Sequence, residues 1–135
     1  MNGQYTEAEL ARAGEALGRS LPSGSVIWLE GELGAGKTTL AQAIARGRGV
    51  TAATTSPTYD LVHRYEGVSG SVFHVDCYRL RQPEDAADLD WATIAGGDLL
   101  VIEWPERAGE WATRPTLRLR LLHDEDELVR CMESR

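Results

Sequence analysis

The chain carries one stretch that constrains its fold strongly, Gly31-Glu32-Leu33-Gly34-Ala35-Gly36-Lys37-Thr38-Thr39. Its spacing is that of a P-loop: a glycine, four residues, then Gly-Lys-Thr. An apolar run over 25–30 precedes it and a helical run over 37–46 follows it, which is the strand–loop–helix setting that the motif requires. Backbone N–H groups at a helix N-terminus bind phosphate, and glycines let the backbone approach the phosphates closely. The stretch therefore predicts a nucleotide site in which Lys37 reaches the β- and γ-phosphates and the Thr38 hydroxyl ligates Mg²⁺.

Lysine usage supports this prediction. Lys37 is the only lysine, and the other positively charged side chains are all arginines. A compact ammonium suits the loop better than a planar guanidinium, which fills more space. Without a second lysine the sequence contains no Asn/Thr-Lys-x-Asp motif for reading guanine, so we expect ATP as the nucleotide. We also expect the loop to face solvent and Lys37 to have no role in the core.

Composition limits the classes of protein to which the chain can belong. Its 135 residues suffice for one domain with its own core, and we expect a single P-loop ATPase domain over 1–135. The net charge of −7 argues against a protein that binds nucleic acid over its whole surface. Two cysteines, Cys77 and Cys131, are too few for a disulfide scaffold and are expected as free thiols. The polar N-terminus and the lack of a long apolar stretch predict a soluble, cytoplasmic protein.

Local patterns predict the elements around the P-loop. A Thr6/Glu9 capping box opens a helix over 6–19. Residues 59–65 and 71–76 are separated by a short glycine-containing turn and predict an antiparallel hairpin. Further predictions are a helical segment from Pro83, a buried strand over 99–103, a half-exposed strand over 116–122, and a tail from His123 that frays or forms a short helix. The fold class is therefore α/β, a P-loop NTPase-like three-layer sandwich with a mixed central sheet and an antiparallel hairpin.

Two carboxylates at strand ends are candidates for the chemistry beside the P-loop. Glu103 ends the continuously apolar run Leu99-Leu-Val-Ile, as a central strand should, and is the stronger candidate for Mg²⁺. Asp76 ends Val-Phe-His-Val and is expected to position or deprotonate the attacking water. The alternative for each is a carboxylate that faces solvent or caps a helix.

Three further features are open to two interpretations each. The hydroxyls of 55–59, Thr-Ser-Pro-Thr-Tyr, form either a switch loop that approaches the γ-phosphate or an ordinary loop. Trp104 is either a core side chain or a contact for another protein. No clear arginine finger is present, although Arg79 and Arg81 follow Asp76 and are considered for that role.

Four motifs occur together in order. They are Gly-Glu-Leu-Gly-Ala-Gly-Lys-Thr-Thr-Leu at 31–40, Ser-Pro-Thr-Tyr at 56–59, His-Val-Asp-Cys-Tyr-Arg-Leu at 74–80 and Ile-Glu-Trp-Pro-Glu at 102–106. This set resembles the TsaE (YjeE) family of bacterial P-loop ATPases, from about residue 6 to residue 106. The chain after Arg107 resembles the family only weakly, and Cys77 stands where the family often has an aliphatic residue.

The resemblance implies a cytosolic ATPase, slow alone, that is needed for threonylcarbamoyladenosine (t6A) synthesis in tRNA and works with TsaD and TsaB. It implies Mg²⁺ ligands at Thr38 and Glu103, a functional aspartate at Asp76, the family tryptophan at Trp104 and an acidic position near the nucleotide at Glu7. We therefore expect Lys37, Asp76 and Glu103 to be catalytic, Thr38 and Glu103 to bind the metal, and Trp104 to contact a partner. The residues expected to bind the nucleotide are Glu7, Gly34, Ala35, Gly36, Lys37, Thr38 and Thr39.

Two other functions remain open from the sequence. A small P-loop kinase is the first, although 135 residues leave little room for the arginine-bearing lid that such enzymes usually add. A nucleotide-gated switch without significant turnover is the second. Phosphate release measured with and without an acceptor separates these possibilities from an ATPase.

Overall fold

The computed structural model describes residues 3–32, 34–51, 61–123 and 129–134. The described strands are β1 Gly3–Thr6, β2 Ser25–Gly31, β3 Val62–Gly67, β4 Gly70–Asp76, β5 Leu99–Glu103, β6 Leu117–His123 and β7 Val129–Ser134. The described helices are α1 Glu7–Ser20, α2 Lys37–Gly47 and α3 Trp91–Ala95, with the 3₁₀ turns η1 Pro83–Ala86, η2 Pro105–Arg107 and η3 Gly109–Trp111. No helix in these ranges is long and apolar enough to cross a membrane.

The strands form one mixed sheet in the order β1-β7-β6-β2-β5-β4-β3. The four middle strands β6, β2, β5 and β4 are parallel, whereas β3 pairs with β4, β7 with β6, and β1 with β7 in antiparallel fashion. All five residues of β5 are buried, as its continuously apolar sequence predicts for a strand covered on both faces. The predicted hairpin is confirmed as β3 and β4.

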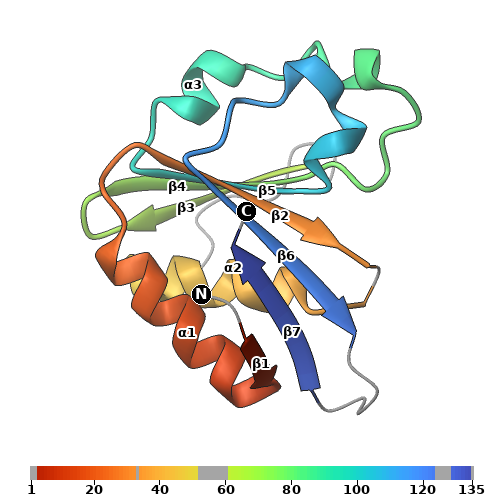
Figure 1. Cartoon of the computed structure of the whole chain (residues 1–135). Coiled ribbons are helices and arrows are strands. Elements are labelled where there is room, and N and C mark those ends of the chain that lie inside the picture. Colours follow the sequence, from red (N-terminus) through yellow and green to blue (C-terminus); the bar gives the residue numbers. More distant parts are fainter. Residues whose placement is uncertain (1–2, 33, 52–60, 124–128, 135) are drawn as a thin grey trace.

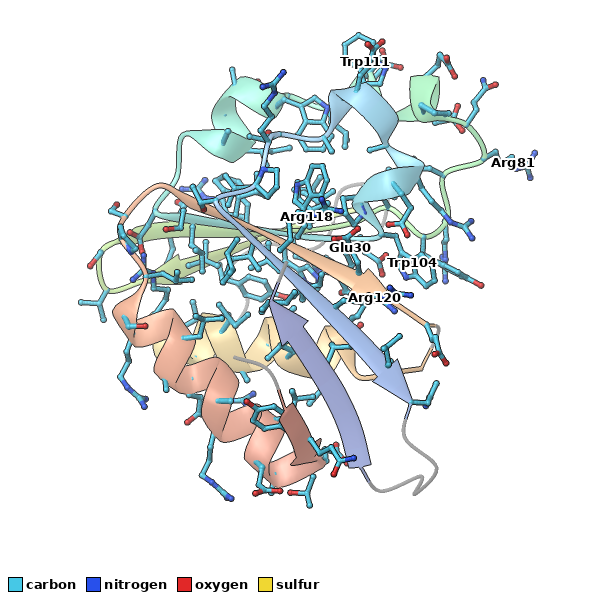
Figure 2. The ribbon with its side chains drawn as sticks, in the orientation of Figure 1. Glu30, Arg81, Trp104, Trp111, Arg118 and Arg120 are labelled. Carbon is cyan, nitrogen blue, oxygen red and sulfur yellow. The ribbon has the colours of Figure 1, made fainter. Side chains whose placement is uncertain are left out.

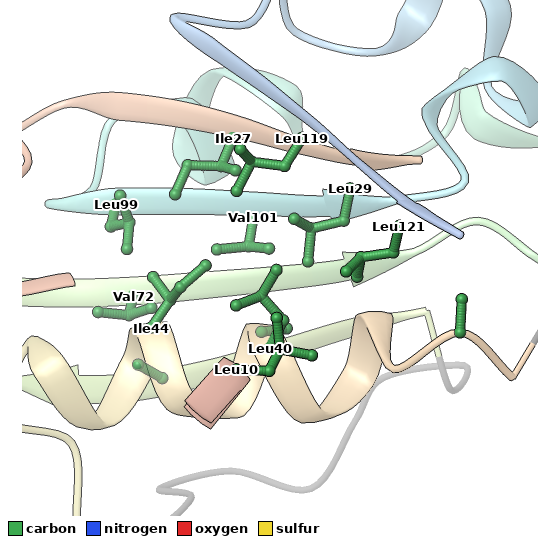
Figure 3. Packing of buried hydrophobic residues seen from close by; sticks show 13 residues of the cluster. Leu10, Ile27, Leu29, Leu40, Ile44, Val72, Leu99, Val101, Leu119 and Leu121 are labelled. Atoms are coloured by element: carbon green, nitrogen blue, oxygen red, sulfur yellow. The ribbon is translucent and has the colours of Figure 1, made fainter. Parts of the chain in front are cut away.

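Helices cover both faces of the sheet, so the predicted three-layer sandwich is confirmed (Figure 1). Helices α1 and α2 lie on one face, and α3 with the 3₁₀ turns lies on the other. Branched aliphatic side chains fill the first interface, between α2 and the parallel strands (Figure 3). Fully buried members of that cluster are Leu10, Ile27, Leu29, Leu40, Ile44, Leu99, Leu119 and Leu121.

Helix α1 begins with the predicted capping box. Glu9 N–H donates to Thr6 Oγ1 at 3.2 Å, and Thr6 N–H donates to Glu9 Oε1 at 2.9 Å.

The two helices on the first face pack closely because glycines line their contact. A Cβ added at Gly18 of α1 would collide with the Ile44 carbonyl oxygen of α2. The backbones therefore touch at this point, and α1 fixes the position of the helix that follows the P-loop.

The predictions were wrong at the two ends of the chain. The tail does not fray or form a helix over 129–134, because β7 pairs with β6 on one side and with β1 on the other. Strand β1 was not predicted at all. Both strands depend on pairing between opposite ends of the chain, which short-range periodicity cannot reveal. The expected switch loop over 55–59 lies outside the described residues.

Candidate nucleotide and metal site

The P-loop connects the end of a central strand to the start of α2. Gly31 ends β2 with φ 127°, and a Cβ there would collide with the Leu121 carbonyl oxygen of β6. Gly36 stands at the N-cap of α2 in the left-handed region, with φ 102°. Ala35 between them is fully buried in the core, so its side chain anchors the loop and cannot line the site.

The N-terminus of α2 differs from that of α1. Glu7 and Glu9 lie in the first turn of α1, and Thr6 caps it. At α2, Gly36 has no side chain to cap the helix, and the first turn contains no acidic residue. Helix N-termini have backbone N–H groups without intrahelical partners and a positive dipole end, so the uncapped N-terminus of α2 suits an anion better than that of α1.

A pocket of about 310 Å³ lies at the carboxyl ends of the parallel strands. Its lining consists of Gly34, Gly36, Lys37, Thr38, Thr39, Asp76, Tyr78, Glu103 and Trp104. Asp76 ends β4 and Glu103 ends β5, and these two residues are register partners in the sheet. The structure thus brings together the predicted lysine, threonines and carboxylates in one cavity.

Lys37 is buried, whereas we expected the loop that carries it to face solvent. Its side chain is buried, with the whole residue 4% exposed, and Nζ donates to the carbonyl oxygens of Gly31 at 2.9 Å and Glu32 at 2.5 Å. Nζ also lies 4.3 Å from the centre of the Trp104 ring. Burial lowers the pKa of Lys37, and the carboxylates of Glu103, Glu106, Asp76 and Glu32 partly oppose that shift. The prediction was wrong because the loop curls around its own lysine, an arrangement that the linear sequence does not show.

Thr38 and Glu103 are in direct contact, which places a hydroxyl and a carboxylate side by side in the pocket. The Thr38 hydroxyl lies 3.1 Å from Oε1 and 3.2 Å from Oε2 of Glu103. Glu103 is only 2% exposed, and His74 Nε2 lies 2.5 Å from its Oε2. A hydroxyl and a carboxylate are hard oxygen donors of the kind that Mg²⁺ takes beside nucleotide phosphates, so the donor set fits that ion. A role for His74 was not predicted, although its position two residues before Asp76 on one strand places both side chains on the same face.

Asp76 is held at the edge of the pocket. Its backbone N–H donates to Leu61 O at 2.9 Å, and its Oδ1 accepts from Tyr78 N–H at 3.0 Å. This side-chain turn fixes the carboxylate where β4 ends, beside Glu103. One carboxylate oxygen is thus committed to the backbone, and Oδ2 is the atom that can face a ligand.

Trp104 combines features of both interpretations. It packs against the cluster on the α3 face, yet it is only partly buried and lines the pocket. Its φ of 55° is the only positive φ of a non-glycine residue among the described residues. Such a conformation costs about 1–2 kcal/mol and persists where surrounding contacts enforce it.

Comparisons with known proteins show the family to which the chain belongs. The family model described as threonylcarbamoyl adenosine biosynthesis protein TsaE matches residues 4–132. The chain belongs to the TsaE family. The tRNA threonylcarbamoyladenosine biosynthesis protein TsaE of Streptomyces coelicolor is 40% identical over 111 residues, covering 80% of this chain and 75% of that protein. The protein of the same name from Treponema pallidum is 39% identical over 119 residues, covering 86% and 87%. The crystal structure of Bacillus subtilis YdiB shares the fold, with a TM-score of 0.75 at 23% identity over 99% of this chain and 86% of that one.

Two positions predicted to bind the nucleotide, Glu7 from the TsaE resemblance and Ala35 from the P-loop motif, do not line the pocket. Glu7 is an exposed residue in the first turn of α1, and Ala35 is a core residue. Glu7 therefore stays a prediction that this geometry does not support. Ala35 can contribute only through its backbone, whose N–H donates to Glu32 O at 3.2 Å.

Neither of the two arginines considered for the role of an arginine finger lines the pocket. Arg79 and Arg81 do not line it, and Arg81 projects away from the molecule (Figure 2). Arg118 is held by Glu30 through two bonds of 2.9 and 3.0 Å. The arginine beside the pocket is Arg107, which the sequence analysis missed: Nη1 donates to Tyr78 O at 2.8 Å, and Cζ lies 5.3 Å from the Trp104 ring centre.

Proposed function

We propose that this protein binds and hydrolyses ATP with Mg²⁺ and serves the synthesis of t6A in tRNA, acting in the cytoplasm together with TsaD and TsaB. Membership of the TsaE family supports the pathway. The contact of 3.1 Å between the Thr38 hydroxyl and the Glu103 carboxylate, at the N-terminus of an uncapped helix, carries the proposal for the site. Contact with tRNA would be indirect, through the complex.

Each residue of the pocket has a distinct task in this proposal. The backbone from Gly34 to Thr39 binds the phosphates through N–H groups at the α2 N-terminus. Lys37 gives up the carbonyls of Gly31 and Glu32 for phosphate oxygens, and Thr38 and Glu103 hold the metal. Bound Mg²⁺ supplies a Lewis acid that neutralises charge on the phosphates.

Asp76 and Trp104 complete the proposed site. Asp76, one oxygen of which is fixed by the Tyr78 N–H, orients the attacking water with the other oxygen. Trp104 lies between the Lys37 ammonium and the exposed side chains of Tyr78 and Arg107, so it links the pocket to the surface. We propose that this surface contacts the partner proteins.

Two substitutions separate the roles of the carboxylates. Glu103→Gln is expected to weaken Mg²⁺-dependent ATP binding and hydrolysis together, because it removes a charged metal ligand. Asp76→Asn is expected to bind ATP with Mg²⁺ almost normally and to lose turnover by about 10²-fold or more, the usual contribution of a positioned acid or base. Calorimetric binding and single-turnover hydrolysis on both variants measure these effects.

Three outcomes would contradict the assignment. The reverse pattern, with Asp76→Asn losing the metal effect, would exchange the two roles. A kinase would be favoured if the phosphoryl group of ATP is transferred to an added small-molecule acceptor faster than to water. ATP binding without measurable turnover, in the presence of the partners, would favour a nucleotide-gated switch.

A further inference from the structure

A buried histidine contacts the proposed metal ligand from behind. His74 lies on β4, is 8% exposed, and does not line the nucleotide pocket. Its Nε2 lies 2.5 Å from Oε2 of Glu103 on the neighbouring strand. Neither the P-loop nor the proposed water-positioning residue needs this side chain, so its presence beside Glu103 requires its own explanation.

The geometry around Glu103 shows what the histidine contributes. The Thr38 hydroxyl is almost equidistant from the two carboxylate oxygens, at 3.1 and 3.2 Å, and therefore does not decide how the carboxylate is turned. His74 contacts Oε2 alone. An N–H at Nε2 fixes that oxygen and leaves Oε1 for the pocket side. A buried carboxylate also needs such a donor, because burial without a hydrogen bond is costly.

The sheet holds His74 rigidly in this position. Its Cα is paired with Val101 of β5 on one side and with His63 of β3 on the other. The ring of His63 lies 5.8 Å from the His74 ring, tilted by 31°. A donor on a strand that is paired along both edges is well suited to orient a ligand, since sites built on strands are more precise than sites on loops.

We propose that His74 is a positioning residue for the metal: its Nε2–H orients the Glu103 carboxylate so that Thr38 and Glu103 present their oxygens to Mg²⁺ together. The inference rests on the proposed role of Glu103 as a metal ligand. Hydrogen bonds of this outer kind typically change metal affinity about 10–100-fold when they are removed. A purely structural role, in which the pair only joins β4 to β5, is the competing explanation.

Two polar substitutions distinguish the explanations. Glutamine places an amide nitrogen near the position of Nε2, whereas asparagine reaches only to the position of Nδ1. The quantity measured is the ratio of the Kd for a non-hydrolysable ATP analogue in EDTA to that in Mg²⁺, here called the magnesium factor. His74→Asn is expected to lower the magnesium factor about tenfold with the Kd in EDTA unchanged. His74→Gln is expected to retain most of it.

The ratio removes the effect of a general loss of structure, which weakens binding in both solutions alike. His63→Asn is the matched control, on the neighbouring strand and next to the same ring, and is expected to leave the magnesium factor unchanged. Thermal melting confirms that each variant is folded. A wild-type magnesium factor in His74→Asn, or an equal loss in His74→Asn and His74→Gln, overturns the proposal for His74.

Failure of the underlying function gives a different result. If Glu103→Gln keeps the full magnesium factor, Glu103 is not the metal ligand, and both proposals are wrong. If Glu103→Gln loses the factor while His74→Asn keeps it, only the positioning role of His74 is wrong.

Discussion

At the residue scale, Lys37 shows how a functional side chain can reduce the stability of the fold. Its ammonium is buried, and burial lowers its pKa below the ordinary 10.5 despite four nearby carboxylates. A lowered pKa for a base means that the folded state accommodates the charged form less well than water does. The charge therefore costs stability at neutral pH, and that cost is relieved as the pH rises from the lowered pKa towards 10.5.

We accordingly expect Lys37→Met to abolish detectable ATP binding without lowering the melting temperature of the nucleotide-free protein. Methionine keeps an unbranched side chain of similar length while removing the charge. Lys37→Arg is the control that keeps the charge; we expect it to lose ATP binding also, because the planar guanidinium does not fit the loop. Calorimetry and thermal melting test both variants. A large fall in melting temperature for Lys37→Met would show instead that the bonds to Gly31 and Glu32 hold the loop together.

At the element scale, the contact between α1 and α2 connects the stability of the fold to the P-loop. A Cβ at Gly18 would lie only 2.1 Å from the backbone oxygen of Ile44, whereas the nearest atoms to a Cβ at Gly14 would be the Ala43 Cβ at 2.8 Å and Leu40 Cδ1 at 2.9 Å. The Leu40 side chain can move aside, but the Ala43 Cβ and the Ile44 carbonyl can do so only with the backbone of α2. The overlap at Gly18 is much the closer of the two, so it demands the larger shift of α2. That helix begins with Lys37 and Thr38, so its position matters for the pocket.

Gly18→Ala is therefore expected to lower the free energy of unfolding by about 1–3 kcal/mol, the usual cost of overpacking, although alanine is the better helix former. Gly14→Ala is the matched control in the same helix and should cost less. Denaturation by urea measures both. Equal and small effects would show that the helices separate easily at Gly18, and that close backbone contact does not constrain α2.

Elements with a strong local pattern were predictable from the sequence. The capping box of α1, the P-loop, the apolar run of β5 and the hairpin each depend on residues that are close in sequence. Strands β1 and β7 were not predicted, because their pairing with each other joins opposite ends of the chain, although β7 also pairs with its sequence neighbour β6. The same limit applies to the site: Thr38 and Glu103 followed from motifs, whereas the contact of His74 and the burial of Lys37 depend on packing.

At the scale of the whole molecule, the pocket has more negative than positive groups of its own. Asp76 and Glu103 line it, and Lys37 is the only cationic side chain among its described lining residues. Arg118 is paired with Glu30, and Arg107 is bound to the Tyr78 carbonyl beside the pocket. In the proposed reaction, the charge that develops on the transferring phosphoryl group would therefore meet no arginine among the described lining residues. An arginine supplied by another protein is worth about 10³–10⁵ in rate.

We expect slow ATP hydrolysis by the isolated protein and marked acceleration when TsaD and TsaB are added. Trp104 is the side chain that should transmit this effect, since it contacts the Lys37 ammonium on one side and Tyr78 and Arg107 on the other. Trp104→Ala is expected to keep ATP binding but to lose most of the stimulation by the partners. Trp104→Phe, which retains a ring at the same backbone position, is the control and should keep more of the stimulation.

Thermal melting separates a contact role for Trp104 from a core role. Truncation of a core tryptophan costs about 3–5 kcal/mol and would lower the melting temperature sharply. The side chain is only partly buried and its backbone is held at a φ of 55°, so we expect a smaller fall. A melt close to that of the wild type together with lost stimulation supports the contact, and a sharp fall supports the core. Turnover by the isolated protein at about 10 per second, an ordinary enzyme rate, would contradict activation by partners altogether.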